Sequence, residues 1–160
     1  MEHRQTGVRD RRKLNCMFRF LAVLAGLNLV WEIIQLPFYT LWQHASWYET
    51  FYAIAHCSAG DVLIAFACAI AALAITRWRW PTPGRQSTLF LLCFISLSVA
   101  YTIFSEWLNT AVRISWAYSD LMPVLPLLGT GVAPLLQWIA LPKLALWLNS
   151  LTSKLRKAGQ

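Results

Sequence analysis

Four apolar runs, each about 19–27 residues long, constrain the fold of this chain more than any other feature of its sequence. They cover residues 18–36, 50–76, 87–108 and 122–141. A helix that rises about 1.5 Å per residue needs roughly this length to cross a hydrocarbon core about 30 Å thick. Charged residues make up 13% of the chain, against about 25% in a typical soluble domain. The sequence therefore predicts an all-α, polytopic integral membrane protein with four transmembrane helices.

The two ends of the chain and the fourth run divide the protein further. Residues 1–17 form a basic segment, residues 18–142 hold the four-helix transmembrane domain, and residues 143–160 form a basic, amphipathic segment. Leucines recur on one helical face of that last segment, which predicts a helix lying in the membrane interface. Prolines and glycines in the fourth run predict a broken helix, because proline removes a backbone donor: Pro123, Pro126, Gly129, Gly131 and Pro134.

The basic residues indicate how the chain is oriented. The net charge is +7, and every Lys and Arg except Arg113 lies within the first 19 residues, in the loop after the second run or in the C-terminal part. Because cytoplasmic loops carry an excess of Lys and Arg, we expect both termini in the cytoplasm. The compact N-terminal anchor favours a bacterial inner (plasma) membrane, with the lipid bilayer as a partner. This clustering argues against nucleic acid, which needs basic residues along one face.

The ionisable groups inside the apolar runs share one depth. With both termini cytoplasmic, Glu32, His56, Asp61 and Glu106 fall in the outer third of the bundle. Asn109 ends the third run, and the outer loop adds further polar and aromatic groups: Arg113, Trp116, Tyr118 and Asp120. Ionisable groups inside a membrane are costly and mark functional sites by default. We therefore expect a polar pocket between the helices, open to the outer surface.

Helical spacing places these groups on shared faces. Asn28 lies one turn before Glu32 on the first helix, and Cys57 lies one turn before Asp61 on the second. His56 flanks the second of these faces. A further stripe follows the third helix: Ser98, Thr102, Glu106 and Asn109.

Carboxyl groups and a histidine in a low-dielectric pocket suit acid/base chemistry on a lipid-soluble, isoprenoid-like substrate. We assign the acid to Glu106 or Glu32 and the base to His56 or Asp61, with Arg113 holding an anionic partner. The catalytic candidates are Glu32, His56, Asp61, Glu106, Tyr118 and Asp120. The predicted substrate-binding residues are Asn28, Asn109, Arg113 and Trp116.

One segment also resembles a known family. Residues 116–125 (WAYSDLMPVL) and 129–138 (GTGVAPLLQW) follow Glu106 in the chain. They are similar to a segment of the carotenoid-biosynthesis membrane family that includes bisanhydrobacterioruberin hydratase. There, an aromatic-x-Tyr-Thr-Asp element precedes a Pro/Gly/Val-rich helix. Members of that family are polytopic and add water to isoprenoid double bonds. The resemblance implies roles in the site for Glu106, Tyr118 and Asp120.

Other interpretations of the same residues stay open. His56, Cys57 and Asp61 offer nitrogen, sulfur and oxygen ligands that suit a divalent metal, although no cofactor is firmly indicated. The chain would then bind or transport a metal cation or protons. Alternatively, it is an accessory subunit of a membrane complex or a homo-oligomer, with its polar stripes facing a partner helix. Glu106 and Arg113 would also satisfy each other as a purely structural ion pair.

Overall fold

The computed structural model describes residues 2–77 and 85–158, and describes side chains for residues 14–77 and 88–152. Its helices are α1 (Glu2–Gln35), α2 (Leu41–His44), α3 (Trp47–Ile75), α4 (Arg85–Trp107) and α5 (Val132–Ala158). A 3-10 turn, Leu36–Phe38, follows α1, and a π-helical turn, Leu108–Val112, extends α4. Within these described residues there is no strand, only two isolated antiparallel bridges. The all-α prediction is confirmed.

Three helical segments are long and apolar enough to cross a membrane: Leu14–Phe38, Trp47–Ile75 and Thr88–Val112. They correspond to the predicted spans 18–36, 50–76 and 87–108, and they give the chain the character of a membrane protein. Their outward faces carry large apolar side chains, which suit contact with lipid. The fourth predicted span is not among them.

The fourth apolar run differs from its prediction, because α5 begins at Val132 instead of Met122. Residues 115–131 form an irregular segment with its own turn hydrogen bonds, among them Leu125 N to Thr130 O at 3.0 Å. Gly129 has φ +62°, a conformation that glycine adopts without a Cβ penalty. Prolines at 123 and 126 cannot donate backbone hydrogen bonds and disfavour helix in the residues before them. An apolar composition therefore does not produce a helix here.

The end of the fourth run also differs from its prediction. Helix α5 continues through Pro142, so residues 143–158 extend the same helix instead of forming a separate one. Leu144 and Leu151 are exposed on this extension, whereas Ala145 is fully buried. The side chains of Lys154, Leu155, Arg156 and Lys157 lie outside the described residues, as do those of the basic residues 1–13. The amphipathic character of the C-terminal segment therefore stays a prediction.

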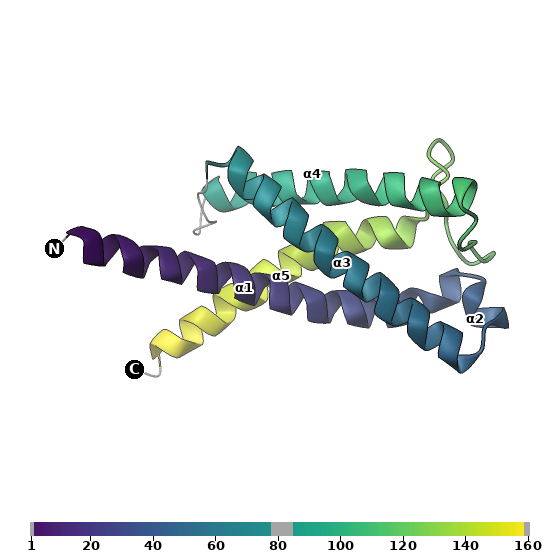
Figure 1. Cartoon of the computed structure of the whole chain (residues 1–160), viewed down its shortest axis with the longest axis horizontal. Helices are drawn as coiled ribbons and strands as arrows, with labels where there is room; N and C mark the ends of the chain where they lie inside the picture. The colour runs from purple at the N-terminus through teal and green to yellow at the C-terminus, as the bar shows by residue number, and fades with distance from the viewer. Residues whose placement is uncertain (1, 78–84, 159–160) are drawn as a thin grey trace.

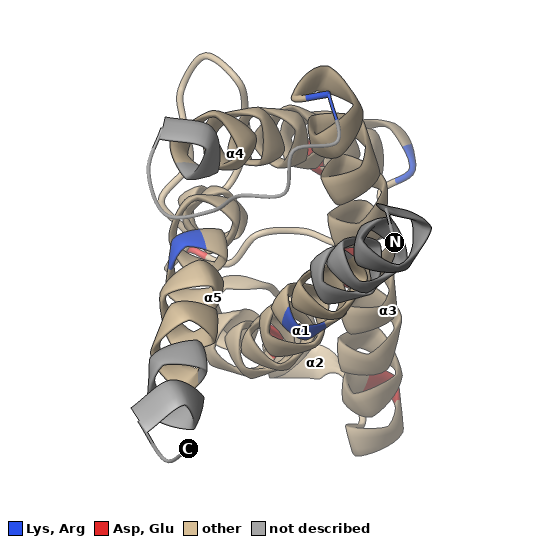
Figure 2. Ribbon diagram, turned by 90° about the vertical axis from the view of Figure 1, so that its left-hand side faces the viewer, with Lys and Arg blue, Asp and Glu red and all other residues tan. Residues whose placement is uncertain are grey.

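The four long helices α1, α3, α4 and α5 surround a common centre (Figure 2). Helix α1 packs against α3 and α5, and α4 packs against the same two helices. Helices α3 and α4 lie close together where α3 ends and α4 begins, and they diverge toward the opposite end (Figure 1). Both chain termini lie at the end where α3 and α4 are close (Figure 1).

The half of the bundle where α3 ends and α4 begins is held by an aromatic core, defined as Phe20, Leu24, Phe90, Phe94 and Trp138. Phe94 contacts the rings of Phe20, Phe90 and Trp138 at centroid distances of 5.6, 6.0 and 6.2 Å. Small residues of α3, including Ala69 and Ala72, let the helices approach these rings. This half is therefore a dry, close-packed interface.

The opposite half is closed by two chain segments that bind each other. Backbone hydrogen bonds join Thr40 N to Ala117 O at 3.0 Å and Ser119 N to Phe38 O at 2.9 Å. The side chain of Ser119 adds a bond to Pro37 O at 2.8 Å. These segments, residues 37–40 and 117–119, are called the cap below. The cap holds the end of α1 beside the chain that leaves α4.

Candidate functional site

A cavity of about 590 Å³ lies between the four long helices, beside the cap. Helix α1 contributes Glu32, α3 contributes Asp61, and α4 contributes Glu106. Apolar residues such as Leu63 and Ile64 line the part nearer the aromatic core. A volume in this range fits a small organic ligand. This space is called the acidic cavity below.

Three carboxyl groups from three helices meet in the acidic cavity. Glu32, Asp61 and Glu106 are exposed by 9%, 8% and 6%. Arg113 and His56 also line the cavity, but both side chains are exposed at its rim. No ion pair joins Glu106 to Arg113 among the described residues, so the structural ion pair is not formed here. Buried carboxyl groups without a cation must be held by hydrogen bonds and shared protons.

Glu32 and Asp61 form a pair within hydrogen-bonding reach of each other. A hydrogen bond between two carboxyl groups needs one proton, because an ionised carboxylate only accepts. Gln137 of α5 donates from Nε2 to Asp61 Oδ2 at 2.7 Å, and Gln35 donates from Nε2 to Glu32 Oε1 at 2.8 Å. Trp31 in turn donates to Gln35 Oε1 at 3.0 Å. The pair is thus fixed from α1, α3 and α5 by hydrogen bonds from Gln35 and Gln137.

Glu106 is held by a different partner. Tyr118 donates its phenolic proton to Glu106 Oε2, while the phenol oxygen accepts from the backbone N of Gly131 at 3.0 Å. Burial raises the pKa of Tyr118, and its hydrogen bond to Glu106 raises it further. Trp116 also lies beside this carboxyl group, but its Nε1 has no hydrogen-bond partner among the described residues. Glu106 therefore accepts one side-chain hydrogen bond, from Tyr118, through Oε2.

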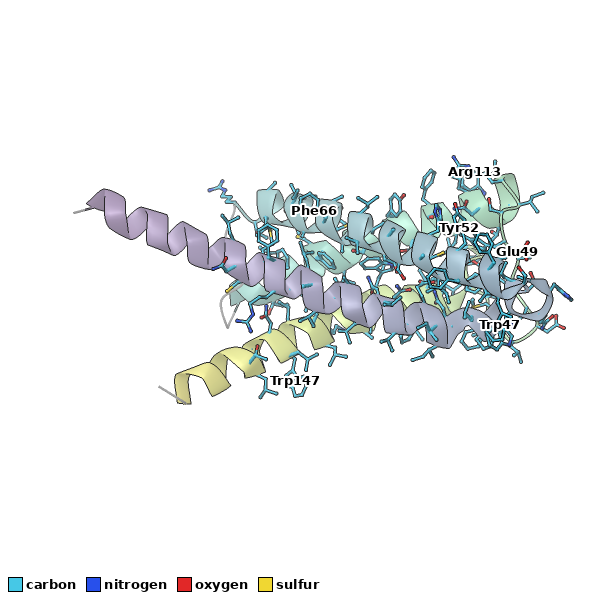
Figure 3. All side chains as sticks on the ribbon, turned by 60° about the horizontal axis from the view of Figure 1, so that its bottom comes forward. Trp47, Glu49, Tyr52, Phe66, Arg113 and Trp147 are labelled. Carbon is cyan, nitrogen blue, oxygen red and sulfur yellow. The ribbon has the colours of Figure 1, made fainter. Side chains whose placement is uncertain are left out.

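The acidic cavity opens on one side of the bundle. Its α1 and α5 residues, such as Glu32 and Gln137, are buried, whereas Leu63 of α3 is 70% exposed and Tyr101 of α4 is 48% exposed. Figure 3 shows Arg113 at the same end of the molecule as Trp47, Glu49 and Tyr52, with Trp147 toward the other end. The exposed lining residues Leu63 and Tyr101 come from α3 and α4, the two helices that diverge toward this end of the bundle (Figure 1).

The structure gathers most of the predicted site residues. Lining the cavity together are Glu32, His56, Cys57, Asp61, Glu106, Asn109, Arg113 and Trp116. Tyr118 reaches the site through Glu106. Two predicted residues lie elsewhere. Asn28 is 1% exposed and does not line the cavity, and neither of its amide atoms has a hydrogen-bond partner in the part of the chain that the structure describes. Asp120 is exposed on the outer segment, away from the lining residues.

No group of His, Cys, Asp and Glu has metal-binding geometry in the part of the chain that the structure describes. His56 and Asp61 both line the cavity, but His56 is exposed and its ring stacks on Tyr52 at 5.8 Å. Asp61 already accepts from Gln137. The binding of a divalent metal by His56, Cys57 and Asp61 therefore stays a prediction.

Sequence reasoning missed Gln137 and Tyr39. Gln137 is a polar residue within the fourth apolar run, and it is 2% exposed beside Asp61. Its position alone was a usable signal, since an amide at membrane depth needs a partner. Tyr39 lines the cavity from the cap. No periodicity marks Tyr39, because it follows a proline-containing turn outside any helix.

Comparison of the chain with family models, with curated proteins and with solved structures finds no match.

Proposed function

We propose that this chain is an integral membrane enzyme that carries out acid/base chemistry on a lipid-soluble, isoprenoid-like substrate in the acidic cavity. One observation carries the proposal: three buried carboxyl groups from three helices share one cavity with apolar side chains in its wall. A packing role alone would favour apolar residues at such positions, because burying carboxyl groups is costly.

The hydrogen bonds suggest how the roles divide. The Glu32–Asp61 pair holds a proton that it can give to a substrate double bond or leaving oxygen. Glu106 accepts from Tyr118 through one oxygen, which leaves its Oε1 to take a proton from the substrate or from water. Donor and acceptor of this kind contribute about 10²–10⁴-fold to a proton-transfer rate. The two carboxyl sites therefore suit the protonation and deprotonation halves of one reaction.

The resemblance to the carotenoid-biosynthesis membrane family supports the same chemistry. Tyr118 belongs to the resembling stretch and Glu106 stands upstream of it, and the two side chains are bonded to each other in the structure. Asp120 belongs to it as well, but it lies on the surface. We therefore extend the resemblance to Glu106 and Tyr118 and assign no chemistry to Asp120.

The membrane arrangement is part of the proposal. Helix α5 supplies Gln137 to the buried pair and packs along α1 and α4, so we place it as a fourth crossing. Near the termini, Arg19 of α1 donates to Thr152 of α5 at 2.7 Å. Both termini lie at one end of the bundle, which fits a cytoplasmic location for the basic segments and an outer location for the acidic cavity.

The test uses the protein purified in a mild detergent and incubated in D₂O with the apolar extract of its source membranes. Mass spectrometry follows compounds that gain deuterium or the mass of water. We expect a protein-dependent change in one class of apolar compound, slowed about 100-fold or more by Glu106→Gln. Gly26→Leu is the control, since Gly26 faces open space outside the cavity.

Two results would overturn the proposal. One is the absence of any protein-dependent change in the apolar extract. The other is an equal rate for wild type and Glu106→Gln in preparations that elute and melt alike. Failure of Glu106→Gln to fold would also count against it, because a glutamine keeps the shape of the carboxyl group and can still accept from Tyr118.

A further inference from the structure

We infer that the acidic cavity takes an apolar ketone, and that Tyr39 donates a hydrogen bond to its carbonyl oxygen. The inference rests on the proposed acid/base function and names its substrate class. It starts from Tyr39, a cavity residue that the roles above leave unused.

The cap fixes Tyr39 beside the carboxyl groups. Its backbone forms a bridge with Tyr118, and the two rings lie 5.7 Å apart between centroids. Its side chain lines the cavity that also holds Glu32 and Glu106. Within the described residues the Tyr39 hydroxyl has no hydrogen-bond partner, unlike that of Tyr118. A phenol held in place without a partner is available to a ligand.

Tyr39 keeps its proton in this setting. Burial raises the pKa of its hydroxyl, and the nearby negative charge of Glu106 raises it further. A neutral O–H donor in an apolar site suits a carbonyl oxygen, which becomes an oxyanion when a neighbouring carbon loses a proton.

Glu106 completes the arrangement as the base. Its carboxylate removes a proton from the carbon beside the carbonyl, and the electrons of that C–H bond form a carbon–carbon double bond. The carbonyl π electrons move onto oxygen, where the hydrogen bond from Tyr39 stabilises them. Glu106 then returns the proton to the same carbon or to a conjugated one. The product is an exchanged or isomerised ketone, with no oxidant or reductant consumed.

The experiment uses 2-tetralone, a bicyclic apolar ketone, with the full chain in detergent and D₂O. Nuclear magnetic resonance measures deuterium exchange at the carbons beside the carbonyl. We expect exchange above the detergent background, slowed about 10²–10³-fold by Tyr39→Phe, which is the usual cost of losing one oxyanion donor. Tyr48→Phe is the matched control: Tyr48 is 78% exposed and is not among the residues that line the cavity, and we expect wild-type exchange.

A second readout does not depend on turnover. The infrared C=O stretch of bound 2-tetralone should fall below its value in detergent alone, and Tyr39→Phe should restore part of the shift. Equal exchange and equal stretching frequency in wild type and Tyr39→Phe would overturn the inference. So would wild-type exchange no faster than that of Glu106→Gln. If the protein still changes compounds of the apolar extract in the assay described above, the proposed acid/base function stands and only the assignment of a ketone substrate is wrong.

Discussion

The two halves of this bundle pack the four helices in different ways, one around a filled core and the other around a cavity. In the aromatic core, rings such as Phe20 and Phe94 fill the centre and are completely buried. In the acidic cavity, the same helices leave about 590 Å³ open and place three carboxyl groups around it. Small α3 residues such as Ala69 close the first half, whereas diverging α3 and α4 open the second. The comparison indicates that one half holds the helices together so that the other half can stay open.

The first test of this comparison removes a proton-transfer group from the acidic cavity and keeps the shape of its side chain. Asp61→Asn keeps an oxygen that accepts from Gln137 but cannot hold the pair's proton. We expect the rate of apolar-substrate conversion to fall about 10²–10⁴-fold with an unchanged melting temperature. Asp120→Asn is the control, since Asp120 is exposed outside the cavity. A comparable loss in both variants would contradict the assignment of the site.

The second way is to damage the aromatic core. Phe94→Ala removes a fully buried ring that contacts three others, and truncations of this kind cost about 3–5 kcal/mol of stability. We expect a large fall in unfolding free energy in micelles, measured by titration with a denaturing detergent. Phe104→Ala, at a ring that is 52% exposed, should lose far less. Equal losses of unfolding free energy in the two variants would show that the aromatic core contributes no more to stability than the exposed rings do.

The third way is to fill the acidic cavity. Gly60 lines it, and a Cβ at this position would meet nothing within 4 Å. Gly60→Leu should therefore occupy ligand space without a backbone clash and weaken 2-tetralone binding about tenfold or more, at least 1.4 kcal/mol on the usual scale of ~1.4 kcal/mol per decade. Gly26→Leu has equal room on a lipid-facing position. Equal binding by both variants would place the ligand elsewhere.

The smallest expected effect is at Asn28, which is 1% exposed with neither amide atom bonded to protein. An unsatisfied buried polar group costs about 1–3 kcal/mol. Asn28→Leu, similar in size, should therefore stabilise the protein by about 1–2 kcal/mol in the same detergent titration. Destabilisation instead would mean that the amide binds a water molecule that the bundle needs.

The sequence predicted the all-α class and three of the helices well, because an apolar run of sufficient length has few alternatives to a helix in a membrane. The sequence also predicted that Glu32, Asp61 and Glu106 lie in one pocket. Shared depth was enough for that prediction, since antiparallel neighbours at equal depth face each other. The three carboxyl groups do meet in one cavity.

The sequence was less informative where the chain is not periodic. Residues 122–131 are apolar but irregular, and α5 passes through Pro142, which was expected to end it. A proline inside a helix leaves one carbonyl without its partner, and neighbouring helices can compensate. Tyr39 was missed because its place depends on backbone bonds between residues 37–40 and 117–119, which are almost eighty positions apart. Such long-range pairing leaves no local pattern.

The bond between Gln137 and Asp61 has a consequence for how the protein is made. The two residues are 76 positions apart in the chain, so Glu32 and Asp61 are synthesised well before their amide partner exists. During insertion, the first two spans enter the bilayer while Gln35 is the only one of the two amide donors already synthesised. Helix α5 then completes the network. A chain truncated before α5 should keep an incomplete network and be degraded by membrane quality-control proteases.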